Sequence, residues 1–197
     1  MNNEWFFVSY LALWGLTLLQ GTAVLGLYRY FGKTILDGRQ ARASEGPSVA
    51  RPLPSIELRG NTGIRLGSPK AAYQFIYCIS STCGLCVEAF PVFCEFALRH
   101  ASTMESILVY AGPQKALESL GASVPTSVAL VTDRKRRVAT GLGIYHVPFA
   151  VLVDSEGIVH AKGMPSKEKD FAWFWEQVQV KEGKIEPHRG MIVQPDM

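Results

Sequence analysis

The sequence predicts an α/β domain, with a central mixed sheet flanked by helices, preceded by one N-terminal transmembrane helix. Two observations predict this fold class. No charged residue occurs between Trp5 and Tyr28, a stretch of membrane-spanning length. From Ser55 onward, short apolar runs typical of buried strands alternate with stretches of helical spacing. The composition, 48% hydrophobic and 19% charged, is that of a folded protein.

The apolar stretch near the N-terminus is long enough for a membrane anchor. As a helix it measures about 36 Å, against about 30 Å for a hydrocarbon core. A cleaved signal peptide is the alternative. The first four residues contain no Lys or Arg, and the apolar run exceeds an ordinary signal-peptide core. We therefore expect an uncleaved anchor over residues 1–37, with the span at about 5–28.

The remaining chain divides into three parts by composition. Residues 38–54 are rich in Gly, Pro, Ser and Arg and lack periodicity, which predicts a flexible tether. Residues 55–181 form the folded domain. Residues 182–197 are polar and are expected to be a C-terminal tail. Within the domain, Gly60–Gly63 separates two apolar runs and predicts a hairpin.

Apolar runs and helical periodicities follow one another along the domain. Buried strands are predicted at 71–80, 106–112, 127–131, 148–154 and 158–164, the last two joined as a hairpin. Helices are predicted at about 87–100, 113–122, 133–142 and 166–181.

Charge and cysteine content limit the possible functions. A net charge of +3, without a basic stripe interleaved with aromatic residues, excludes nucleic acid as the expected partner. Four cysteines are too few for a disulfide-dense scaffold. A zinc site built on Cys83 and Cys86 would need scattered further ligands, so no metal and no cofactor are expected.

Cys83 and Cys86 stand between a predicted strand and a predicted helix. At a helix start, unpaired backbone N–H groups and the positive end of the helix dipole favour a thiolate. One turn separates the two residues, so their Cα atoms should lie about 5 to 6 Å apart, which suits a disulfide. We interpret Cys83 as the attacking thiolate and Cys86 as the resolving thiol. Inert core cysteines are the alternative, and this is how we interpret Cys78 and Cys94.

Pro148 opens a predicted buried strand far along the chain. The order of elements resembles thioredoxin-like domains, in which a cis-proline at this point packs against the cysteine pair. The resemblance implies a cis Val147–Pro148 bond, with the Val147 backbone available to a client chain. His146 either contacts the client or is a surface residue at the strand entry.

The anchor, the tether, "STCGLC" and "VPFAVLVDSEGIVHAKG" together resemble the MauD family of methylamine utilisation proteins, which are membrane-anchored and thioredoxin-like. The resemblance implies thiol–disulfide oxidoreductase or isomerase activity in the maturation of methylamine dehydrogenase, whose small subunit carries many disulfides. It also implies a bacterial inner-membrane location, with the domain in the periplasm beside a membrane or periplasmic redox partner.

The sequence departs from the family at Gly84, where the family tends to have Pro, and Thr82 replaces the Trp of thioredoxin. The residues between the cysteines tune the reduction potential, so oxidant, reductant and isomerase all remain open. Lys and Arg follow the apolar run, which by the positive-inside rule alone places the domain in the cytoplasm. We expect the periplasm, because the client implied by the resemblance is exported. A metallochaperone or docking module, or a thiol peroxidase, are the alternative functions.

Overall fold

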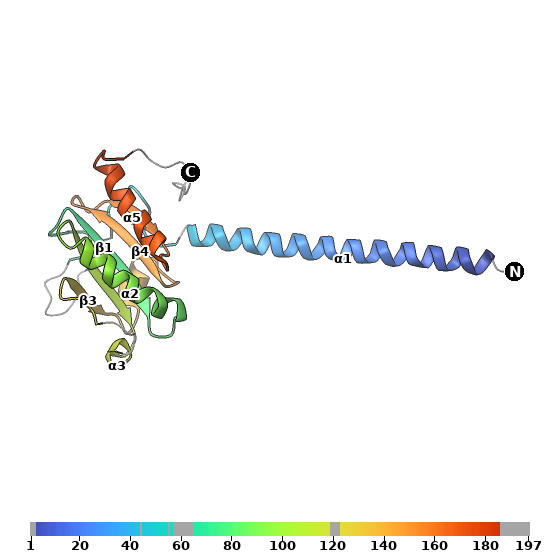
Figure 1. Cartoon of the computed structure of the whole chain (residues 1–197), viewed down its shortest axis with the longest axis horizontal. Helices are drawn as coiled ribbons and strands as arrows, with labels where there is room; N and C mark the ends of the chain where they lie inside the picture. The colour runs from blue at the N-terminus through green and yellow to red at the C-terminus, as the bar shows by residue number, and fades with distance from the viewer. Residues whose placement is uncertain (1–2, 44, 55, 57–64, 119–122, 186–197) are drawn as a thin grey trace. The chain divides into compact units, whose positions relative to one another are not determined.

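A computed structural model describes residues 3–43, 45–54, 56, 65–118 and 123–185 (Figure 1). The chain divides into two compact units, 1–44 and 45–197. The first unit consists of a single long helix, α1 (Asn3–Ala43). The second unit contains every strand that the structure describes.

Helix α1 contains the predicted span. Its Trp5–Tyr28 portion is long and apolar enough to cross a membrane, and the side chains there are exposed. The helix continues to Ala43, whereas a flexible tether was predicted from residue 38. The prediction of a tether over 38–43 is therefore wrong. Arg, Gln and Ala are good helix formers, and extending an existing helix requires no new nucleation.

The rest of the predicted tether, 45–54, packs against the domain, so the prediction of a flexible segment is wrong here as well. The Leu53 amide donates to the Gly157 carbonyl at 2.8 Å, and the Leu53 side chain is buried. The Ala50 amide donates to the Val159 carbonyl at 2.8 Å. Composition predicted flexibility because the pairing partners lie about a hundred residues away in sequence, beyond the reach of local patterns.

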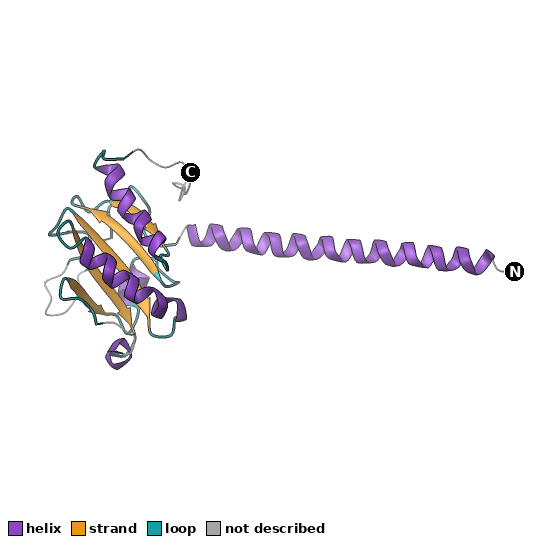
Figure 2. Cartoon of the chain, in the orientation of Figure 1, coloured by secondary structure: helices purple, strands orange, loops and turns teal. Residues whose placement is uncertain are grey.

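The sheet is mixed, as predicted (Figure 2). Parallel pairing joins its first three strands, and the last two are antiparallel to their neighbours. The spatial order is β3 (Val128–Thr132), β2 (Met104–Ala111), β1 (Tyr73–Ser80), β4 (Phe149–Asp154) and β5 (Val159–Gly163).

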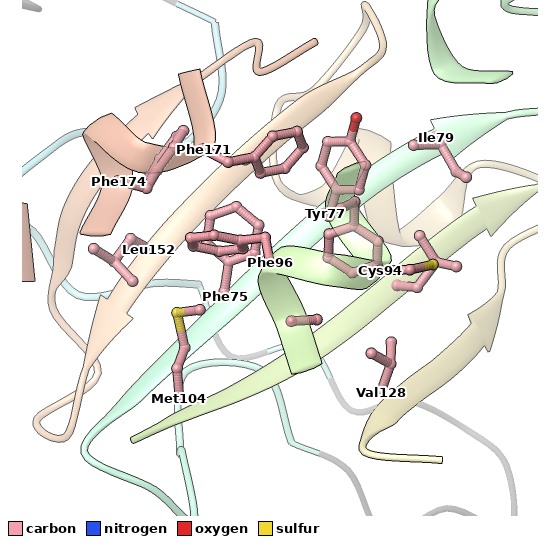
Figure 3. Close-up of a cluster of buried hydrophobic side chains, with 14 of the residues drawn as sticks. Phe75, Tyr77, Ile79, Cys94, Phe96, Met104, Val128, Leu152, Phe171 and Phe174 are labelled. Atoms are coloured by element: carbon pink, nitrogen blue, oxygen red, sulfur yellow. The ribbon is translucent and has the colours of Figure 1, made fainter. Parts of the chain in front are cut away.

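Both faces of the sheet are covered. Helices α2 (Gly84–Arg99) and α5 (Glu168–Lys181) pack on one face over an aromatic cluster that includes Phe75 and Tyr77 of β1 (Figure 3). The ring centroids of Tyr77 and Phe93 lie 4.7 Å apart. The opposite face packs against Val138 of α4 (Arg137–Gly141) and against Leu53 and Ile56. Because β1 is buried on both sides, its sequence is a nearly continuous apolar run, interrupted within the strand by the buried Gln74.

One predicted element is shorter than expected, and others lie partly or wholly outside the described residues. Helix α3 is Gln114–Glu118, and residues 119–122 of the predicted helix lie outside the described residues. Helix α4 begins at Arg137, four residues after the predicted start at 133. The Asp133 side chain instead accepts hydrogen bonds from the Arg137 and Val138 amides in the first turn of the helix. The predicted hairpin at Gly60–Gly63 and residues 186–197 of the tail lie outside the described residues.

Candidate active site

Cys83 and Cys86 form a disulfide at the start of α2, with a Cα–Cα separation of 5.2 Å. Cys83 is the N-cap, and its sulfur accepts a hydrogen bond from the Cys86 amide at 3.2 Å. Cys86 is fully buried, whereas Cys83 is half-buried. Of the two cysteines, Cys83 is therefore the one that a second protein can approach.

A tight turn carries the chain from β1 to this pair. The Ser81 amide donates to the Ala111 carbonyl at 3.1 Å, and the Cys83 amide donates to the Ser80 carbonyl at 3.3 Å. The hydroxyls of Ser80 and Thr82 lie 3.1 Å apart. These bonds satisfy the turn backbone and fix Cys83 at the carboxyl end of β1.

Val147 and Pro148 lie beside the cysteine pair. Their peptide bond is cis, as the resemblance implied. The Val147 carbonyl oxygen is 3.4 Å from Cys83 Sγ, a distance at which the reduced thiol donates a hydrogen bond to it. The antiparallel pairing of β4 with β1, in register Cys78–Phe149, brings the start of one strand to the end of the other. The catalytic and client-binding roles of these residues stay predictions.

His146 is held by a residue that sequence reasoning missed. The buried Glu45 carboxylate contacts His146 Nδ1 at 2.8 Å and accepts hydrogen bonds from the amides of Tyr145 and His146. Burial raises the pKa of Glu45, but the hydrogen bonds from His146 and Tyr145 outweigh burial, so this pKa lies below its usual value. No sequence signal pointed to Glu45, because it lies 101 positions before His146 in a stretch predicted to be a tether.

The chain was compared with protein families, with known protein sequences and with solved structures. No family model matches the chain. The chain is 25% identical over 174 residues to the methylamine utilization protein MauD of Methylorubrum extorquens, covering 83% of this chain and 82% of that protein. The predicted resemblance to MauD is therefore confirmed.

Solved structures that are similar to the domain include the following three. A candidate thiol:disulfide interchange protein, DsbE, from Chlorobium tepidum superimposes with a TM-score of 0.57 at 19% identity, covering 68% of this chain and 97% of that one. The exposed lipoprotein thioredoxin of Streptococcus pneumoniae gives 0.51 at 19%, with 64% and 99% covered. A thiol:disulfide interchange protein from a Bacteroides species gives 0.50 at 22%, with 74% and 98% covered. The chain has the thioredoxin-like fold.

Exposed apolar side chains occur next to the cysteine pair in sequence and just before Val147, the residue whose carbonyl faces Cys83. Leu85, between the two cysteines, is 58% exposed, and Tyr145, two residues before Val147, is 62% exposed. Val87, in the first turn of α2, is 39% exposed. Exposed apolar side chains beside a reactive group are typical of a surface that binds another protein.

The remaining two cysteines lie in the core of the thioredoxin-like domain. Cys78 and Cys94 are both unpaired and buried. Burial and the charge of Asp133 raise the pKa of Cys78 to about 12, and burial raises that of Cys94 to about 11. Among the residues that the structure describes, no group of three or more His, Cys, Asp and Glu side chains is placed to hold a metal ion.

Proposed function

We propose that this chain is a membrane-tethered thiol–disulfide oxidoreductase that exchanges disulfides with cysteine-containing protein clients. The observation that carries the proposal is the Cys83–Cys86 disulfide at the start of α2, with one cysteine half-buried and the other fully buried. The similarity to MauD and to solved thiol:disulfide interchange proteins supports it.

The unequal burial of the two cysteines defines the order of steps. A client thiolate attacks Cys83 Sγ, the bond to Cys86 breaks, and Cys86 leaves as a thiolate that takes up a proton. A second client thiolate then attacks the client sulfur of the mixed disulfide and releases Cys83. The client loses two electrons, which a membrane or periplasmic redox partner removes from the Cys83–Cys86 dithiol. The reverse sequence reduces a client disulfide.

The strand entry beside the disulfide provides the surface for the client. The Val147 carbonyl lies against Cys83, and Val147 as a residue is only partly buried, so an extended client segment can add its backbone there as a strand. The exposed side chains of Leu85 and Tyr145 provide apolar contact. His146, with 67% of its side chain exposed, is placed to contact the client as well.

The similarity to MauD supports a specific biological role. We propose that the client is the small subunit of methylamine dehydrogenase and that the domain works in the periplasm, attached to the inner membrane through residues 5–28. An oxidising compartment is the one in which disulfide formation and reshuffling are useful.

The test uses the full-length chain and its Cys86→Ala variant. We expect the variant to accumulate mixed disulfides with its client through Cys83, and the wild-type chain to catalyse exchange with a reduced cysteine-rich substrate in glutathione buffer. The Cys83→Ala variant is the matched control and should form none. Tight Cu(I) binding by the wild-type dithiol without any exchange would support a metallochaperone instead.

A further inference from the structure

The loop that presents Val147 to the disulfide forms hydrogen bonds with Glu45, 100 positions before Tyr145, and with Arg136, nine positions before it. On one side, the Glu45 carboxylate accepts hydrogen bonds from the backbone amides of Tyr145 and His146 and contacts the His146 ring. The Glu45 side chain is only 3% exposed. A carboxylate buried to this extent is stable only while such partners are in place.

On the other side, Arg136 donates from Nη2 to the Tyr145 carbonyl at 2.7 Å. The backbone next to Glu45 is also attached to the loop, because the Gly46 amide donates to the Gly143 carbonyl at 3.0 Å. A positive φ of 75° and the close approach of the Phe149 ring make Gly46 suited to this position. The carboxylate and the guanidinium thus hold the amide and carbonyl groups of one short segment.

We propose that Glu45 is a positioning residue for the redox site: with Arg136, it holds the Tyr145–Val147 backbone so that the Val147 carbonyl faces Cys83 Sγ. The inference rests on the proposed function and adds a residue to its machinery. Glu45 does not contact the Cys83 sulfur itself. It acts through the backbone that places the Val147 carbonyl next to this sulfur.

The arrangement predicts a measurable effect on the Cys83 thiol. A carbonyl oxygen facing the sulfur accepts a hydrogen bond from the neutral thiol and repels the thiolate, and so raises the thiol pKa. Loosening the segment withdraws this oxygen, and the Cys83 thiol pKa falls. A lower thiol pKa stabilises the reduced pair, so the reduction potential rises, which makes the disulfide more oxidising.

The experiment compares Glu45→Ala and Arg136→Met in the full-length chain by alkylation of Cys83 against pH. The two variants remove charges of opposite sign, so a purely electrostatic effect moves the thiol pKa down in the first and up in the second. Loss of positioning moves it down in both, by about half a unit to one unit. Glu45→Gln keeps the side-chain size and serves if Glu45→Ala does not fold. The controls are the exposed residues Glu156→Gln and Lys135→Met, which should leave the thiol pKa unchanged.

Shifts in opposite directions, or no shift in either variant, would overturn the proposal. Lower thermal stability with an unchanged thiol pKa would show that Glu45 has a structural role only. Because the thiol titration is an equilibrium measurement without a client, it succeeds or fails independently of turnover. Absence of exchange by the wild-type chain would overturn the proposed function instead.

Discussion

The Val147 carbonyl oxygen lies 3.4 Å from the Cys83 sulfur, although the two residues are 64 positions apart in the chain. Strand pairing produces this contact. β4 runs antiparallel to β1, so the residues that lead into β4 lie at the end of the sheet where β1 stops and α2 begins. The site is thus built at one end of two adjacent central strands, which explains how a partly exposed disulfide can rest on a rigid core.

The four cysteines should separate into two classes in the reduced, folded protein. With a pKa of about 11, about one in a thousand Cys94 thiols is ionised at pH 8. The ionised fraction of Cys78 is smaller still, because its pKa is higher. We expect brief alkylation at pH 8 to add one group, at the half-buried Cys83, and alkylation after unfolding to add four. Intact-mass measurement checks the count. Rapid modification of the folded Cys83→Ser, Cys86→Ser double variant would contradict it.

Gly84→Pro should stabilise the domain. Residue 84 is the first position of α2, where Pro is favoured, and the preceding Cys83 already has the extended φ and ψ of −101° and 109° that a following Pro requires. A Cβ at residue 84 meets nothing within 4 Å. We expect the free energy of unfolding to rise by about 0.4–1 kcal/mol in denaturant titrations. Gly46→Ala should do the opposite, because its φ is 75° and the new Cβ would lie 2.7 Å from the Phe149 ring.

Asp133→Ala should destabilise the domain by about 1–2 kcal/mol. The buried Asp133 carboxylate accepts hydrogen bonds from the amides of Arg137, Val138 and Ala139 at 2.7, 2.9 and 3.0 Å, and so caps the first turn of α4. Chemical denaturation measures the loss. The neighbouring exposed Arg134→Ala serves as the control and should leave stability within about 0.5 kcal/mol of wild type. Equal effects of the two substitutions would contradict the capping role.

Asp154 should make stability depend on acid pH. Burial raises the pKa of Asp154, but hydrogen bonds from Lys181 and from the Ile158 and Glu156 amides outweigh it and lower the pKa below its usual value. A lowered folded-state pKa gives stability that is present above the unfolded pKa, about 4, and is lost as the pH falls through the folded pKa.

The comparison variant for this effect is Asp154→Asn. At pH 7 we expect wild type to exceed it in free energy of unfolding by about 1–2 kcal/mol, and the difference to shrink as the pH falls below about 4. Urea titrations across this pH range measure both. Glu156→Gln, at an exposed position in the same turn, should show no such trend. A difference that is constant with pH would contradict the assignment.

Residues 5–28 should keep the protein in the membrane without cleavage. We expect the full-length chain to remain with the membranes after a carbonate wash and to show its intact mass. Release of a soluble species shorter by about forty residues would identify a signal peptide instead. Replacing two leucines within the span by lysine is the matched variant and should release the protein, because each central lysine costs about 2.5–3.5 kcal/mol on insertion.

Local patterns in the sequence determined the elements and the reactive pair. The absence of charge from Trp5 to Tyr28, the apolar run of β1 and the placement of Cys83 before a helix each depend on residues close together in the chain. Such features predict an anchor helix, a doubly buried strand and a redox motif, because hydrophobic periodicity and helix-terminus electrostatics act over a few residues.

Tertiary structure alone decided what surrounds that pair. Glu45 lies in a stretch predicted to be a flexible tether, and Arg136 lies in the predicted helix at 133–142. Both nevertheless form hydrogen bonds with the backbone beside Cys83. Their partners are other backbone groups, which have no signature in the side-chain sequence. A buried carboxylate that binds amides 100 positions away becomes visible only when sheet pairing has brought both segments together.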